Sequence, residues 1–149
     1  MSIHEAIDID RLLDDIDGGR GARDTIVIPV PTPTTRAIPQ VRSTVRDVVA
    51  PAMRPADPAE LQLICSELVS NAVLHGDAPV RLILHEGADL IVVAVHDGGS
   101  ADPVMGTGPT DGLRIIDELT HGAWGISRRR PGKWVWAALP RATPTERAH

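Results

Sequence analysis

Short apolar runs, each ended by proline, glycine or a charged residue, alternate along the chain with longer segments of helical period. Val, Ile and Leu dominate residues 25–30, 80–85 and 90–96, a composition that favours strands. Only residues 86–89, with one glycine among them, separate the second run from the third, which predicts a β-hairpin. The first run contains a proline and is followed by two more, so we predict that it lies at an edge of the sheet.

Apolar residues recur every three to four positions in two further segments, which predicts helices. The first segment covers residues 38–50 and ends where a series of prolines breaks the pattern. The second begins after Asp57, a suitable N-cap, has Pro58 at the first helical position, and ends at Gly76. Two helices in succession are therefore expected after the first strand.

A glycine-rich stretch at residues 98–112 separates the hairpin from the last elements. It is long for a connection in a compact domain, and such loops tend to be lids or ligand-binding loops. A short helix over residues 113–119 and a closing hairpin of residues 124–126 and 134–139 follow. The order β-α-α-β-β-loop-α-β-β predicts an α+β fold, with the helices covering one face of a mostly antiparallel sheet.

The chain divides into three segments. Residues 1–24 form an acidic N-terminal appendage, which could be a short amphipathic helix or disordered. Residues 25–140 form one domain, in line with a total length of 149 residues. Residues 141–149 form a tail that is expected to fray.

Composition narrows the class of partner. The formal net charge is −5 and there is no Phe or Tyr, which argues against nucleic-acid binding. Cys65 is the only cysteine, which excludes an intramolecular disulfide and a cysteine-rich zinc site. The longest apolar run is too short to cross a bilayer, and the first residues lack the basic region of a signal peptide. We therefore expect a cytoplasmic protein that binds neither nucleic acid nor membrane.

Candidate chemistry lies on the second predicted helix. Glu67 and Asn71 are four positions apart, so their side chains lie one above the other on a helix. Mg²⁺ prefers oxygen ligands and keeps part of its hydration shell, so the Asn71 amide oxygen with phosphate oxygens could form its inner shell. The Glu67 carboxylate would then serve in proton transfer. Taken alone, the same spacing also fits an ordinary solvent-facing pair.

A second candidate, Asp97, ends the third predicted strand. Side chains alternate along a strand, so Asp97 shares a face with Val93 and Val95. If that face meets the helices, the carboxylate is partly buried and needs hydrogen-bond donors, and the exocyclic amine of adenine would be one. An aspartate followed by two glycines is also common in simple turns after a strand.

Together these motifs resemble the GHKL ATPases, and within them the small bacterial anti-sigma factor serine kinases. The resemblance runs over residues 26–139. Residues 67–76 match the N-box, residues 97–103 the first glycine box, residues 112–125 the second, and residues 132–136 the closing strand. The resemblance implies a two-layer α/β sandwich of the GHKL (Bergerat) type, with helices on one face of a mixed, mostly antiparallel sheet.

The resemblance also implies a role for each matching residue. Asn71 would ligate magnesium, Glu67 would act as the catalytic general base or polarise the attacking group, and Asp97 would accept a hydrogen bond from the adenine amino group. Glycines would let the backbone approach the base and bend a lid over the phosphates, where amides at the start of a helix suit an anion. The further residues implied to bind the nucleotide are Gly99, Gly106, Gly108, Gly112 and Leu113.

The activity implied is that of a Mg-ATP-dependent serine/threonine protein kinase. Its acceptor would be a serine of an anti-sigma antagonist protein, its regulated target a sigma factor, and its assembly a homodimer. Positioning and charge neutralisation are the main needs of such a phosphoryl transfer. The alternative is a non-catalytic module of the same fold, which sequesters a sigma factor or an antagonist while its nucleotide site is degenerate.

Two residues depart from the family pattern. Asp111 places a carboxylate where phosphates would arrive, and it could instead cap the following helix. Trp134 stands where relatives usually have a threonine that helps to hold adenine through water. Either change would weaken nucleotide binding without touching Glu67, Asn71 or Asp97.

Overall fold

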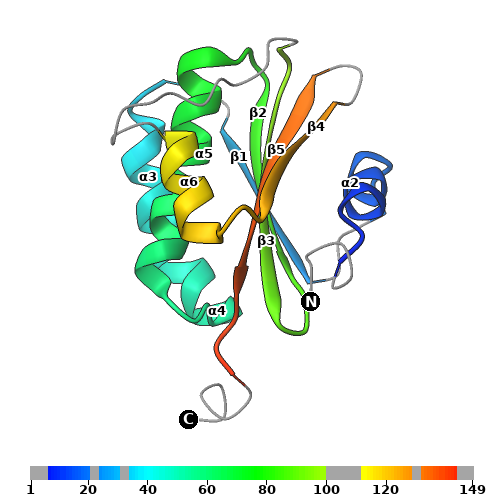
Figure 1. The fold of residues 1–149 in the computed structure, drawn as a ribbon. Helices are drawn as coiled ribbons and strands as arrows, with labels where there is room; N and C mark the ends of the chain where they lie inside the picture. The colour runs from blue at the N-terminus through cyan, green and yellow to red at the C-terminus, as the bar shows by residue number, and fades with distance from the viewer. Residues whose placement is uncertain (1–6, 21–23, 31–33, 100–111, 129–131, 144–149) are drawn as a thin grey trace.

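Within the described residues, five strands make up a single sheet, in the order β1-β2-β3-β5-β4. The computed structural model (Figure 1) describes residues 7–20, 24–30, 34–99, 112–128 and 132–143. All four strand pairings are antiparallel, β1 lies at one edge as predicted, and β2 and β3 form the predicted hairpin. The strands are β1 (Thr25–Val30), β2 (Val80–Glu86), β3 (Leu90–Asp97), β4 (Trp124–Arg128) and β5 (Lys133–Pro140).

The helices that follow β1 and β3 pack together on one face of this sheet (Figure 1). The helix predicted at residues 38–50 continues to Met53, and five residues in its middle wind as a π-helix. Arg54, in the left-handed conformation with φ of 53°, follows its last turn. The elements of this layer are α3 (Ala37–Thr44), the π-helical turn η1 (Val45–Val49), α4 (Ala50–Met53), α5 (Pro58–His75) and α6 (Gly112–Thr120).

The start of α5 agrees with the sequence signals. The Asp57 carboxylate accepts hydrogen bonds from the backbone N–H groups of Ala59 and Glu60, at 3.0 and 3.3 Å. These bonds satisfy donors that the first turn of a helix leaves without a partner. Leu61 and Leu68, on the inner side of α5, are buried against the sheet. Cap and apolar stripe together fix the helix that carries the candidate site.

The main core lies between this helical layer and the sheet. Alternate strand residues, such as Val93, Val95 and Val135, point into it. Burial of each such side chain stabilises the fold by roughly 1.5–3 kcal/mol. The predicted fold class, an α+β two-layer sandwich with helices on one face of a mostly antiparallel sheet, is confirmed.

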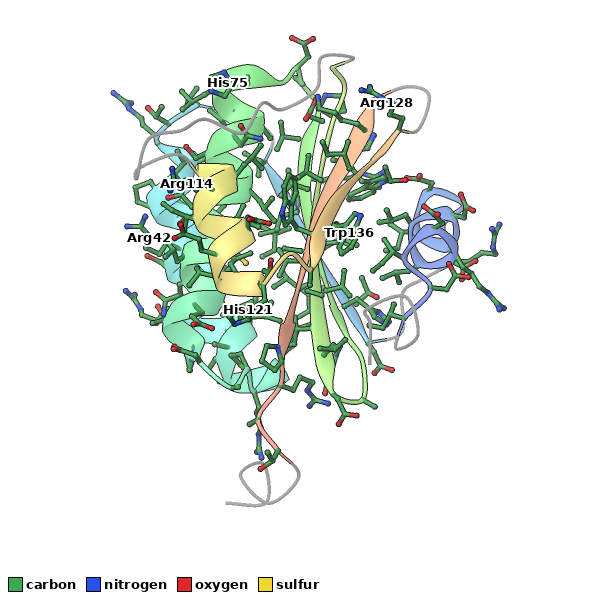
Figure 2. The ribbon with its side chains drawn as sticks, viewed as in Figure 1. Arg42, His75, Arg114, His121, Arg128 and Trp136 are labelled. Atoms are coloured by element: carbon green, nitrogen blue, oxygen red, sulfur yellow. The ribbon has the colours of Figure 1, made fainter. Side chains whose placement is uncertain are left out.

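In the part of the chain that the structure describes, one helix lies on the other face of the sheet. Helix α2 (Ile9–Asp17) stands apart from the other helices in Figure 1, and its Leu13 is buried against Trp134 and Trp136. Figure 2 shows Trp136 on this side of the sheet. Of the two alternatives for the acidic appendage, its described part is therefore an amphipathic helix, whereas the division into three segments stays a prediction. Within the described residues, no helix is long and apolar enough to cross a membrane.

Candidate functional site

The candidate site lies along the C-terminal half of α5, beside the start of α6. Figure 2 shows His75, near the end of α5, and Arg114, in the first turn of α6, toward the same end of the helical layer, with His121 at the other. Leu68 and Ala72 of α5 are buried against the core. Glu67 and Asn71, each one position earlier, are only half-buried. The helical period therefore holds this pair at the rim of the core, one turn apart, as the sequence predicts.

Glu67 meets the second glycine motif in space. A Cβ added to Gly112 would lie 2.5 Å from Glu67 Oε2, so the carboxylate packs against the first residue of α6. The free N–H groups at a helix start give that end a partial positive charge, which attracts anions. Two motifs 45 positions apart in the chain thus join at a point suited to bind negative charge.

Leu113, the next residue, contributes to the site differently from Gly112. Its side chain is 2% exposed and belongs to the main core. Any contact of Leu113 with a ligand would therefore be made by its backbone. Gly106 and Gly108 of the predicted lid lie outside the described residues, as does Asp111.

Asp97 is buried at the end of β3 and already has partners. Its Oδ1 accepts a hydrogen bond from the backbone N–H of Gly99 at 2.8 Å. The same oxygen accepts a hydrogen bond from Lys133 Nζ at 2.9 Å. The two charged side chains are 3% and 4% exposed, so the ion pair is almost completely shielded from water. The expected burial of Asp97 is found, but its donor is a lysine of the chain itself.

Backbone geometry explains why Lys133 reaches Asp97. The two residues are direct partners in the β3–β5 register, so both side chains leave the sheet on the same face. Gly132, with φ of 89°, turns the chain into β5, where a Cβ would collide with the Asp97 carbonyl oxygen. The pair is therefore held by the strands themselves rather than by a flexible loop.

Glycines pack closely around the Asp97 carboxylate. A Cβ at Gly76 would lie 2.6 Å from Asp97 Cγ, and one at Gly99 would lie 3.0 Å from Asp97 Oδ1. Both positions come from motifs that the sequence singled out, one at the end of α5 and one after β3. Absence of side chains here lets two backbone segments approach the carboxylate, whereas the role expected for Gly99, the approach of its backbone to the base, stays a prediction.

Trp134 does not enter the candidate site, so the expectation that it weakens nucleotide binding there is wrong. Its side chain lies on the α2 side of the sheet, where its Nε1 donates to both carboxylate oxygens of Asp17, each at 3.2 Å. Strand alternation is the reason, since neighbouring residues of β5 point to opposite faces. Lys133, not Trp134, is the residue of β5 that enters the candidate site.

Lys133 is the residue that sequence reasoning missed. It was noticed only as part of the closing-strand motif, yet it is the only lysine in a chain that has 14 arginines among its 15 basic residues. The antiparallel pairing of β3 with β5 would have placed the first residue of one strand opposite the last of the other. That register, once drawn, pairs a lysine with the candidate aspartate.

Neither a reactive thiol nor a preformed cluster of metal ligands is found beside Glu67 among the described residues. Burial raises the pKa of the Cys65 thiol far above its usual range, so this neighbour of Glu67 is no nucleophile. No group of three or more His, Cys, Asp or Glu side chains that could hold a metal ion occurs among the described residues. A metal at Asn71 would therefore take most of its oxygen ligands from a bound phosphate or from water.

No protein-family model and no curated protein matches the sequence. Among solved structures, the NMR structure of the histidine kinase domain of the E. coli osmosensor EnvZ is similar to it. The similarity covers 78% of this chain and 89% of that chain, with a TM-score of 0.44 and 14% sequence identity. What this chain binds has to be argued from its own residues.

Proposed function

We propose that the chain is a GHKL-type domain that binds Mg-ATP and transfers its terminal phosphoryl group to a serine of a partner protein. The observation that carries the proposal is the contact of Glu67 with Gly112, at the end of the fold where buried Asp97 also lies. Such a reaction needs a general base, a helix start that binds the phosphates and a carboxylate that binds the adenine.

The phosphate end of the site would lie at the first turn of α6. Its backbone N–H groups, aided by the helix dipole, would bind phosphate oxygens without a side chain at Gly112 in the way. Glu67 would lie beside those phosphates, where it could take the proton of an attacking hydroxyl. In the unliganded chain the same carboxylate lies against the helix start, so it would give way when phosphates bind.

Magnesium would be bound by Asn71. The half-buried position of its amide, one turn from Glu67, fits a single protein oxygen that completes a shell made mainly of phosphate and water oxygens. Bound there, magnesium would neutralise the charge of the phosphates. Glu67 would remain free of the metal and available for proton transfer.

The protein partner is an anti-sigma antagonist, a sigma factor or both, and the active assembly is a homodimer. These parts of the proposal rest on the motif resemblance alone. Incubation of the chain with Mg-ATP and the partner protein, followed by detection of phosphoserine on that partner, would test the partner assignment directly.

Calorimetric titration of Mg-ATP into the purified chain tests the nucleotide site. Saturable binding should be lost in Asn71→Ala and kept in Gln62→Ala, a control substitution on the same helix. Saturable binding in Asn71→Ala would contradict the metal site.

A second candidate function is favoured by the Asp97–Lys133 ion pair. Because this pair fills the carboxylate's hydrogen-bonding capacity at Oδ1, the chain could act as a non-catalytic module that binds a partner without nucleotide. The substitution Glu67→Ala separates the two functions. It should abolish phosphotransfer but spare partner binding if the chain is a kinase, and change neither partner binding nor its biological output if it is a module.

A further inference from the structure

Lys133 is an unusual lysine. Charged ammonium groups are almost never fully buried unless they are paired, yet the side chain of this only lysine is 4% exposed. Its Nζ donates to Asp97 Oδ1 at 2.9 Å and reaches the Gly99 carbonyl oxygen at 3.5 Å. Both contacts are made to residues of the first glycine motif, the segment proposed to bind a base.

The ammonium thus stands where a donor group of a base would be needed. An exocyclic amine is a neutral donor, whereas the ammonium also carries a charge opposite to that of the carboxylate, so its hydrogen bond to Asp97 is the stronger of the two. The backbone N–H of Gly99 donates to the same Oδ1, so this oxygen is already shared by two donors. A base that bonds to this oxygen of Asp97 must compete with Lys133, and the strand register keeps that competitor in place.

We propose that Lys133 is the determinant of nucleotide affinity and base choice in this site, acting as a built-in competitor for Asp97. The inference rests on the proposed function and deepens it. A 6-aminopurine nucleotide binds through its base only when the Lys133 ammonium releases Asp97. Lys133 is a positioning residue, since it sets the hydrogen-bonding state of Asp97 and takes no part in phosphoryl transfer.

A distinctive base preference follows. In the wild type the amino group of adenine gains Asp97 only by displacing Lys133, so its net contribution is small, and the chain should bind ATP and purine riboside triphosphate, which lacks that group, with similar affinity. Replacement of Lys133 by an apolar residue of similar length frees the carboxylate. In Lys133→Met, ATP should bind about tenfold more tightly than in the wild type, and about tenfold more tightly than purine riboside triphosphate.

The experiment is a pair of calorimetric titrations, with Mg-ATP and with magnesium purine riboside triphosphate, into the full chain. The wild type, Lys133→Met and Arg81→Met are compared. Arg81→Met is the matched control, because Arg81 pairs with Asp17 at 3.1 Å on the opposite face of the same sheet. Loss of an ion pair as such would lower the melting temperature of both variants. Only Lys133→Met should bind ATP more tightly than the wild type and prefer ATP to purine riboside triphosphate.

A second measurement does not depend on the variant folding. Since Lys133 is the only lysine, protein labelled with 15N-lysine gives one side-chain ammonium resonance in NMR. Addition of saturating Mg-ATP to the wild type should shift this resonance or broaden it beyond detection, because the ammonium loses Asp97. A resonance unchanged on saturation would overturn the proposal.

The calorimetric outcomes separate the two levels of inference. If the wild type binds ATP and folded Lys133→Met binds it no better, the role of Lys133 is refuted while the nucleotide site stands. If folded Lys133→Met binds ATP and the wild type does not, the competitor role is supported in its strongest form. If neither binds, the proposed nucleotide site and the role of Lys133 both fail.

Discussion

The two faces of the sheet bury similar apolar side chains but are covered in different ways. Among the described residues, helices α3 to α6 cover one face and α2 covers the other (Figure 1). Neighbouring residues of β5 anchor the two sides: Lys133 pairs with Asp97 on the first face, and Trp134 donates to Asp17 on the second. One strand therefore holds a completely buried ion pair and a half-exposed polar contact back to back.

Burial makes the ion pairs on the two faces, Asp97–Lys133 and Asp17–Arg81, differ in energy. Asp97 and Lys133 have almost no contact with water, so removing either one leaves a charge that nothing compensates. Asp17 and Arg81 are 30% and 35% exposed, and such a pair adds little to stability. Arg81 also lies over the Trp134 ring, 4.9 Å from its centroid, which adds a weak cation–π attraction. The first face should decide whether the chain folds, and the second whether α2 stays docked.

The largest expected effect comes from the helical face. Leu68 of α5 is 1% exposed and lies in the main core. Leu68→Ala should lower the free energy of unfolding by about 3–4 kcal/mol, because it removes buried apolar atoms and leaves a cavity at the centre of the layer. Urea denaturation followed by circular dichroism measures this loss. A cost below about 1 kcal/mol would show that the helical layer adapts far more easily than its packing suggests.

A smaller effect is expected for the equivalent change in α2. Leu13 is completely buried, so Leu13→Ala removes the same buried side-chain atoms as the first variant. A helix of nine residues is marginal alone and can detach without unfolding the sheet, so the loss cannot exceed the free energy with which α2 docks. We expect about 2 kcal/mol, seen as faster hydrogen exchange in α2. An equal loss of global stability in both variants would mean that α2 and the domain unfold together.

Cys65 offers a direct way to tell local from global opening. The thiol is completely buried on α5, in the main core, and burial raises its pKa. Labelling by a thiol reagent therefore requires the helical face to open. The labelling rate should rise strongly in Leu68→Ala and remain at the wild-type value in Leu13→Ala. Faster labelling in the second variant would remove the distinction between the two faces.

The polar contact of α2 should have a smaller effect still. Asp17→Asn removes the charge that pairs with Arg81 but leaves an oxygen to accept from Trp134 Nε1. We expect a loss of about 0.5–1 kcal/mol, since the pair is partly exposed and one hydrogen bond survives. Chemical denaturation at low and high salt measures it, and the difference between variant and wild type should shrink at high salt.

The main face could be predicted well from the sequence. Strand alternation, the Asp57 cap and the helical spacing of Glu67 and Asn71 are local signals, and the structure agrees with each. The close approach of Glu67 to Gly112 was accessible only through the family resemblance, because 45 positions separate the two residues. Local patterns predict which face a residue lies on, but not which distant residue it meets there.

The second face and the ion pair illustrate that limit. The α2 segment was left open between helix and disorder, because a short acidic amphipathic segment is stable only when a partner surface exists. That surface is made by residues of distant strands, among them Trp134 and Ile83. Trp134 rather than Lys133 was expected beside the nucleotide with Asp97, because a shift of one residue in a strand changes the face on which a side chain lies. Both failures concern contacts between distant segments, because the register of a strand depends on its partner strand as well as on its own sequence.

The smallest expected effect is a pH dependence at the β1–β2 edge. His85 of β2, whose Nδ1 lies 3.0 Å from Thr25 Oγ1, has its pKa lowered below 6.5, chiefly by burial. The unfolded chain then binds a proton more readily than the folded one, so stability is complete above pH 6.5 and falls as the pH drops through and below that value. In His85→Gln this part of the slope should vanish, which denaturation of both proteins between pH 7.5 and about pH 5 would show. Since β1 and β2 support both faces, the same slope should appear in Leu13→Ala; its absence there would mean that His85 is buried only while α2 is docked.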